Sequence, residues 1–192
     1  LYTNPIVKDD TIMVCSPDNT IYSIDIESGE KNWEFQTGSD YFTSTPMIYN
    51  NIVYIGGLDN YLYALDFKTG VELWKYDVGE PIYKSIIIEN NIAVINTGDK
   101  LIAIDTSTRM EIWENISDEP NSGYSSDNDT DAIHNNTIFV NGGSYLYAFD
   151  LNTGQEKWKY KRENIGDCSS PVVINEMVIY GDEHNIFALD EN

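Results

Sequence analysis

The densest group of possible metal ligands in this sequence is a short acidic stretch. Asp127, Asp129 and Asp131 alternate along residues 125–131, so a carboxylate recurs at every second position. Oxygen ligands of this kind suit Ca²⁺, which takes about six to eight of them. The glycine and the distal glutamate of an EF-hand loop are missing, and the alternative is a solvated acidic loop. The stretch is therefore a candidate calcium site, and the sequence suggests no other metal site.

Other side chains with catalytic potential are few and scattered. Cys15 and Cys168 lie far apart in the sequence, and we expect two separate buried thiols. His134 and His184 have no cysteine or histidine partner at metal-ligand spacing. No glycine-rich phosphate loop follows a strand and opens a helix. We therefore expect no catalytic residues, no cofactor-binding residues and no resident cofactor.

The charge of the chain narrows the range of partners. Its 192 residues include 11 Lys and Arg against 32 Asp and Glu, for a net charge of −21. Nucleic-acid binding needs clustered basic residues, so we expect no nucleic-acid partner. No apolar run approaches the roughly 20 residues of a membrane-spanning helix, so we expect no direct membrane insertion. The chain opens on Leu1 without a basic and then apolar leader, so any signal peptide is expected to be removed or left out.

A tandem repeat organises the whole chain. Each copy has an Asp at the end of an apolar string; three copies have a Gly four residues later, and four have a Trp eight residues after the Asp. The repeated residues are Asp25, Asp66, Asp105, Asp150 and Asp190; Gly29, Gly70 and Gly154; and Trp33, Trp74, Trp113 and Trp158. The aspartates recur at intervals of 39 to 45 residues. A period of this size indicates a solenoid, a propeller or another array.

Each unit is predicted to hold four short antiparallel strands. In the second unit these are Met47–Tyr49, Ile52–Ile55, Tyr61–Leu65 and Glu72–Tyr76, all rich in β-branched and aromatic residues. An Asn or Asp pair joins the first two strands of most units, as a type I′ hairpin requires. Four antiparallel strands in about 40 residues are typical of a β-propeller blade, whereas a helical repeat would need amphipathic helices. The predicted blades cover residues 3–36, 44–77, 84–115, 129–161 and 169–192, the last without its fourth strand.

The repeated residues have structural explanations. The Asp can accept backbone N–H bonds two or three residues on, and the Gly supplies a left-handed conformation. Arg109 stands at the glycine position of the third copy, and we expect a looser or differently shaped turn there. Because the Trp recurs in every complete unit, we expect it to be buried between neighbouring blades rather than to form a stacking surface for a sugar or a quinone.

The strings Leu62–Tyr76 and Leu146–Tyr160 resemble the PQQ-like (quinoprotein or BamB-like) β-propeller repeat, and the resemblance covers nearly the whole chain. It implies an all-β propeller of four-stranded antiparallel blades joined by a tryptophan docking motif. Members of this family mostly have seven or eight blades. This chain holds four complete blades and one partial blade, so we expect part of a larger propeller; the alternative is a small, imperfectly closed one.

The resemblance implies two kinds of function. One is a PQQ-dependent dehydrogenase, whose site uses adjacent cysteines, Ca²⁺, acidic ligands and a catalytic Asp; Cys15 and Cys168 cannot form that vicinal disulfide. The other is a cofactor-free scaffold. We expect a non-enzymatic extracytoplasmic propeller (periplasmic, cell-surface or secreted) that serves as a protein-interaction scaffold, a ligand-recognition domain or a sensor domain. A fragment of a quinoprotein dehydrogenase, with its active-site residues outside this chain, is the alternative.

Two further expectations concern the surface. The sequons at Asn115, Asn128 and Asn135 would suit glycosylation in a secreted protein, although an Asn-rich chain also produces them by chance. Exposed strand edges and uncovered faces on the end blades would favour self-association.

Overall fold

A computed structural model describes residues 4–38, 44–117, 131–162, 169–181 and 184–190. Every helix or strand in these ranges is a β-strand. Among them there is accordingly no helix with the length and hydropathy needed to cross a bilayer. The chain divides into two compact units, Leu1–Ile86 and Ile87–Asn192, and each is described by itself.

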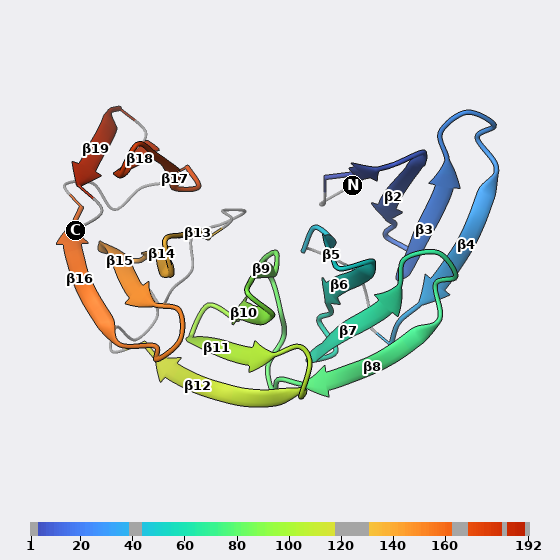
Figure 1. Ribbon diagram of the computed structural model, residues 1–192, viewed down its shortest axis with the longest axis horizontal. Coiled ribbons are helices and arrows are strands. Elements are labelled where there is room, and N and C mark those ends of the chain that lie inside the picture. Colours follow the sequence, from blue (N-terminus) through green and yellow to red (C-terminus); the bar gives the residue numbers. More distant parts are fainter. Residues whose placement is uncertain (1–3, 39–43, 118–130, 163–168, 182–183, 191–192) are drawn as a thin grey trace. The chain divides into compact units, whose positions relative to one another are not determined.

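Unit 1 contains two antiparallel sheets of four strands each, in the orders β1-β2-β3-β4 and β5-β6-β7-β8 (Figure 1). The strands of the first sheet are β1 (Ile6–Lys8), β2 (Thr11–Cys15), β3 (Thr20–Asp25) and β4 (Lys31–Gln36). Those of the second are β5 (Met47–Tyr49), β6 (Ile52–Gly56), β7 (Tyr61–Asp66) and β8 (Glu72–Asp77). Strands that are neighbours in sequence are therefore neighbours in each sheet.

Unit 2 contains three sheets with the same meander topology. The first is formed by β9 (Ile87–Glu89), β10 (Ile92–Asn96), β11 (Lys100–Asp105) and β12 (Met110–Ile116). The second is formed by β13 (Ala132–His134), β14 (Thr137–Gly142), β15 (Tyr145–Asp150) and β16 (Glu156–Lys161). The third has three strands, β17 (Val172–Ile174), β18 (Met177–Gly181) and β19 (Ile186–Asp190).

The hairpin between the first two strands of each sheet explains the Asn-rich pairs. Both residues of Asn50-Asn51, and their counterparts in the three sheets of unit 2, have positive φ angles between 45° and 64°. Asn tolerates this region better than most residues, which is why a two-residue type I′ turn selects it. Glu176 adopts it as well, at φ 63°. The first hairpin differs, because Asp9 alone has a positive φ there.

Neighbouring sheets within a unit pack face to face. In unit 1, Met13 and Ile21 of the first sheet share a buried cluster with Val53, Tyr63 and Leu65 of the second. The middle strands β6 and β7 are buried at nearly every position, which explains their almost continuous apolar sequences. The outer strand β8 is buried at Trp74 and mostly exposed elsewhere. This burial gradient places the core in the middle strands and leaves the fourth strand at the surface.

Candidate functional site

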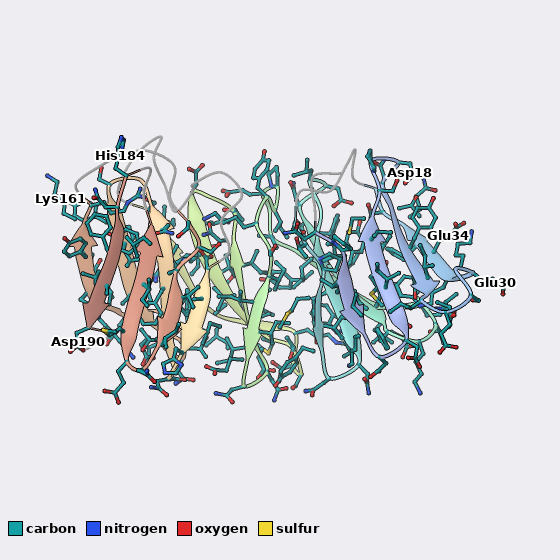
Figure 2. All side chains as sticks on the ribbon, turned by 90° about the horizontal axis from the view of Figure 1, so that it is seen from above. Asp18, Glu30, Glu34, Lys161, His184 and Asp190 are labelled. Carbon is teal, nitrogen blue, oxygen red and sulfur yellow. The ribbon has the colours of Figure 1, made fainter. Side chains whose placement is uncertain are left out.

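Each sheet has two ends with different turns. The turn between the third and fourth strands carries the repeated Asp, and we call this end the Asp end. The turn between the second and third strands lies at the opposite end, which we call the loop end. Figure 2 shows Asp18 and Glu30 at opposite ends of the first sheet, and His184 and Asp190 at opposite ends of β17–β19.

At the Asp end, the repeated carboxylate organises its turn in the same way in four sheets. Asp66 Oδ1 accepts hydrogen bonds from the backbone N–H of Thr69 and from its hydroxyl, both at 2.8 Å. The backbone carbonyl of Asp66 accepts a bond from the N–H of Gly70 at 2.9 Å. Asp25, Asp105 and Asp150 cap their own turns in the same manner. Asp190 is the last residue of β19, and the residues that would complete its turn lie outside the described ranges.

These bonds favour the ionised carboxylates. Hydrogen bonds from Thr69 hold the pKa of Asp66 below its usual value. The backbone N–H of Ser28 and that of Thr108 lower the pKa of Asp25 and of Asp105 in the same way. At Asp150 burial acts in the opposite direction, but the bonds from Thr153 and the rest of its turn outweigh burial and the pKa is again lowered. The carboxylates are thus stabilised as anions that cap turns.

Two of the repeated tryptophans connect neighbouring sheets within a unit. Trp33 Nε1 donates to the carbonyl of Phe67, the residue after Asp66, at 3.0 Å. Trp113 Nε1 donates to the carbonyl of Leu151, the residue after Asp150, at 2.9 Å. Trp33, Trp74 and Trp113 are buried, and Trp158 is half-buried. An indole that buries its ring and satisfies its N–H across a sheet-to-sheet contact joins the two sheets.

The sequence makes room for each indole. Trp33, Trp74, Trp113 and Trp158 pair across the ladder with Ser23, Ala64, Ala103 and Ala148, respectively. The ladder shifts register directly after each of these small residues. A small cross-strand partner beside a β-bulge lets a large side chain lie against the sheet.

The glycines of the Asp end have two different reasons to be glycine. Gly70 and Gly154 have φ near +70°, and a Cβ on either would lie 2.5–2.6 Å from the indole of Trp33 or Trp113. Gly29 has the same φ but nothing within 4 Å of its Cβ position. The left-handed conformation thus favours glycine at all three positions, whereas packing against tryptophan leaves no room for a Cβ at Gly70 and Gly154 alone.

The expectation of a looser turn at Arg109 is wrong. Arg109 adopts φ 64°, close to the glycines at the same position, and its N–H donates to the carbonyl of Asp105 at 2.7 Å. The hydrogen bonds of the Asp105 turn hold the arginine in a left-handed conformation that a side chain with a Cβ normally avoids. The turn therefore keeps its shape, and the arginine that replaces glycine is held in a strained backbone conformation.

The loop end differs from sheet to sheet. In the first two sheets, Asp18 accepts a hydrogen bond from Tyr22 Oη at 2.8 Å and Asp59 accepts one from Tyr63 Oη at 2.5 Å. The bond from Tyr22 lowers the pKa of Asp18, and burial together with the bond to Asp59 raises the pKa of Tyr63. Gly143 replaces the Asp at this turn of β13–β16, although Tyr147 remains at the tyrosine position.

Sequence reasoning missed the buried polar residues of the loop end. Asn96, at the end of β10, donates through Nδ2 to the carboxylate of Asp131 at 3.0 Å, and both are buried. Asn141 stands at the same position in β14 and donates to the carbonyl of Ser169 at 2.9 Å. Two other second strands have glycine there, so comparing the repeats position by position would have singled out both asparagines.

The calcium candidate is described in part. Asp131 is buried and bonded to Asn96, whereas Asp127 and Asp129 lie outside the described residues. Within the described ranges, no group of three or more His, Cys, Asp or Glu is placed to hold a metal ion. The calcium site remains a prediction.

The remaining reactive side chains have ordinary surroundings. Cys15 is buried in the core of unit 1, and Cys168 lies outside the described residues. His134 ends β13 and His184 is exposed just before β19. The sequon residue Asn115 is half-buried and donates through Nδ2 to the carbonyl of Gly154 at 2.6 Å. Asn135 lies exposed in a hairpin turn, and Asn128 is outside the described residues.

The outer strand β12 has an unusual surface. It is the last strand of its sheet (Figure 1) and carries three exposed apolar side chains, Met110 at 67%, Ile112 at 41% and Ile116 at 70%. The corresponding strand β16 carries three lysines, a residue type that discourages edge-to-edge pairing. The strand β12 has no lysine. Its edge is therefore suited to contact with another chain.

Comparisons with known proteins identify the repeat. A family model described as "Outer membrane protein assembly factor BamB" matches residues 1–81 and, in a second match, residues 42–192. A comparison with curated protein sequences found no match.

Solved structures share the fold at low sequence identity. BamB from Moraxella catarrhalis is 20% identical with a TM-score of 0.80, over 97% of this chain and 60% of that one. The computationally designed Ika8 protein is 17% identical with a TM-score of 0.82, over 97% of this chain and 57% of that one. A quinohemoprotein alcohol dehydrogenase from Comamonas testosteroni is 17% identical with a TM-score of 0.78, over 98% of this chain and 41% of that one. The chain thus spans three fifths or less of each structure, and the all-β propeller fold expected from the repeat is confirmed.

Proposed function

Because this chain belongs to the BamB-like family of PQQ-like repeat propellers, we propose that it is a non-enzymatic, extracytoplasmic scaffold that binds a partner protein. The family description names an outer membrane protein assembly factor, and this supports a role for the chain that involves other proteins. A scaffold needs a rigid body and an accessible contact strand. Within each unit, the Asp turns and a tryptophan contact between sheets supply this rigidity.

The exposed apolar edge of β12 is the observation that carries this proposal. An outermost strand has backbone groups free to pair, and an extended peptide can add to it as a further strand. Met110, Ile112 and Ile116 would contact apolar side chains of that peptide. Glu111 and Glu114 lie on the same strand of a strongly acidic chain. The partner segment is therefore extended, apolar and basic.

A photo-crosslinking residue at Ile112 or at Ile116 tests the proposal in living cells. We expect one discrete adduct with an extracytoplasmic protein from both positions. A lysine introduced at the other of the two positions should abolish the adduct, because it protects the edge as the lysines of β16 do. The same crosslinker at Lys161, on an edge that already carries lysines, is the matched control. Adducts of equal yield at Lys161 would contradict the assignment to β12.

Whether this chain itself holds a quinoprotein site is tested separately from the alternative of a fragment whose active-site residues lie outside it. A quinoprotein site of this family would use adjacent cysteines, and this chain does not fit that requirement: its two cysteines are not neighbours, and Cys15 is buried in a packed cluster. Titration of the purified chain with PQQ and Ca²⁺, followed by absorbance, should show no stoichiometric complex. A complex would overturn the non-enzymatic scaffold in favour of the dehydrogenase.

A further inference from the structure

Arg162, the residue after β16, is a buried cation with unused hydrogen-bond donors. It exposes 5% of its surface. Its backbone N–H donates to the carbonyl of Ser144 at 2.9 Å, and Nη2 donates to the carbonyl of Gly143. Nε and Nη1 are buried and have no hydrogen-bond partner in the described part of the chain. Since a guanidinium has five N–H donors, most of them lack an acceptor.

The fold does not need an arginine at this position. The residue after the fourth strand donates its backbone N–H to the adjacent turn in every four-stranded sheet. The equivalent residues are Thr37, Val78 and Ser117, and their acceptors are the carbonyls of Asn19, Asn60 and Asp99. A hydroxyl or an aliphatic side chain therefore suffices for the backbone contact. The guanidinium is an addition peculiar to β13–β16.

The turn beside Arg162 lacks the negative side chain that the first two sheets carry. Asp18 and Asp59 occupy this turn there, whereas Gly143 occupies it here. The carboxylate of Asp131, just before β13 at the same end of the sheet, is hydrogen-bonded to Asn96.

The strand that leads to Arg162 reinforces the positive potential. Residues 157–162 contain four of the 11 basic residues of the chain. Lys157 lies 3.8 Å from a carboxylate oxygen of Asp150, and Lys159 lies 3.7 Å from one of Glu156. Lys161 is exposed at the loop end (Figure 2). The positive charge nearest Arg162 in sequence is therefore open to solvent.

We propose that Arg162 binds the carboxylate of a small molecule at the loop end of β13–β16. Arginine stays charged at any physiological pH, and a buried guanidinium whose Nε and Nη1 have no acceptor among the described residues is strongly unfavourable. The carbonyl of Gly143 accepts one of the two Nη2 hydrogens. The other Nη2 hydrogen and one on a neighbouring nitrogen remain as two donors along one edge of the guanidinium. The two oxygens of a carboxylate match such a pair of donors. At a net charge of −21 the chain repels an acidic macromolecule more strongly than a small anion, which favours a free carboxylate over an acidic partner protein.

Thermal unfolding in acetate or succinate, at constant pH and ionic strength, tests this site. Linkage predicts a rise in Tm of roughly 3–6 °C at ten times the dissociation constant, which then continues to grow with the logarithm of the ligand concentration. Arg162→Thr places at this position the residue type that the first sheet has, and it should remove the rise. In chloride alone this variant should be at least as stable as the unsubstituted chain, because an uncompensated buried charge has been removed. Lys161→Thr is the matched control and should keep the rise.

Three outcomes would overturn the proposal. They are the absence of this logarithmic rise in the unsubstituted chain, an equal rise in Arg162→Thr, and a rise produced by an Asp-rich and Glu-rich peptide but not by free carboxylates. Arg162→Lys adds a test that does not depend on the threonine variant folding. It keeps the charge but loses the two-donor edge, and should weaken binding by about tenfold. Equal binding by Arg162→Lys would contradict the assignment to the guanidinium.

Discussion

The two ends of each sheet differ in how closely they follow the repeat. At the Asp end, four sheets carry the same capping carboxylate, and the residue four positions later has the same left-handed conformation even where it is Arg109. At the loop end, an Asp–Tyr bond in two sheets gives way to an Asn–Asp pair after β10 and to a buried arginine after β16. The Asp end is constrained by the contact between sheets. The loop end also has hydrogen bonds between sheets, from Asn96 to Asp131 and from Asn141 to Ser169, but they do not repeat one pattern, and this end carries the features peculiar to single sheets.

Among the substitutions that test the difference between the two ends, removal of an indole at the Asp end should have the largest effect on the free energy of unfolding. Trp113→Ala should destabilise the chain by about 3–5 kcal/mol, because a buried ring and its bond to Leu151 are both lost. Trp158→Ala, at the same strand position but half-buried, should have a smaller effect. Urea unfolding followed by circular dichroism measures both. A loss below about 1 kcal/mol for Trp113→Ala would mean that the repeated Trp does not hold the sheets together.

Substitution of the glycines at the Asp end should have the next largest effect on stability, and the effect should differ between a glycine with open space around it and one packed against a tryptophan. Gly29→Ala should lose about 1–2 kcal/mol from its left-handed conformation alone. Gly70→Ala should lose roughly 1–3 kcal/mol more, because its Cβ would overlap the indole of Trp33. The difference between their free energies of unfolding isolates the packing contribution. Equal losses would show that Trp33 moves aside without penalty.

Arg109→Gly should have a smaller effect, of the opposite sign. The arginine holds φ 64° in a turn whose hydrogen bond to Asp105 is already formed. Glycine reaches this conformation without strain, so the substitution should stabilise the chain by up to about 1 kcal/mol. A rise in Tm on substitution, with the circular dichroism spectrum unchanged, would support the interpretation that Arg109 is strained. Arg109→Ala keeps a Cβ and should give no such gain.

The sequence predicted the Asp end well because its determinants are local. The carboxylate, its turn and the following glycine lie within five residues, and repetition multiplies the pattern; the predicted strand Tyr61–Leu65 is observed as Tyr61–Asp66. Arg109 shows the limit of this reasoning, since the surrounding hydrogen bonds overrode the preference of one residue. The Asn96–Asp131 bond joins residues 35 apart in sequence, and the burial of Arg162 depends on neighbouring turns. No local pattern reports such contacts.

The smallest expected effect concerns the charge of the capping carboxylates. Hydrogen bonds from Thr69, chiefly from its hydroxyl, hold the pKa of Asp66 below its usual value of 3.8. The folded chain therefore binds fewer protons than the unfolded chain in this range. The stability contributed by the Asp66 carboxylate is complete above about pH 4–5 and is lost as the pH falls through the lowered pKa.

Thr69→Val removes the hydroxyl donor and keeps the backbone donor and the side-chain shape. It should raise the pKa of Asp66 toward 3.8, and carboxyl ¹³C NMR titration measures this directly. The pKa of Asp105 is lowered chiefly by the backbone N–H of Thr108, so it should not change and serves as the internal control. In the variant the pKa of Asp66 would be closer to its value in the unfolded chain, so ionised Asp66 would stabilise the folded chain less. The difference in Tm between the variant and the unsubstituted chain should therefore narrow from pH 7 to pH 3. A constant difference across this range, with an unchanged Asp66 titration, would show that the hydroxyl does not stabilise the ionised carboxylate and that the backbone alone shapes the Asp end.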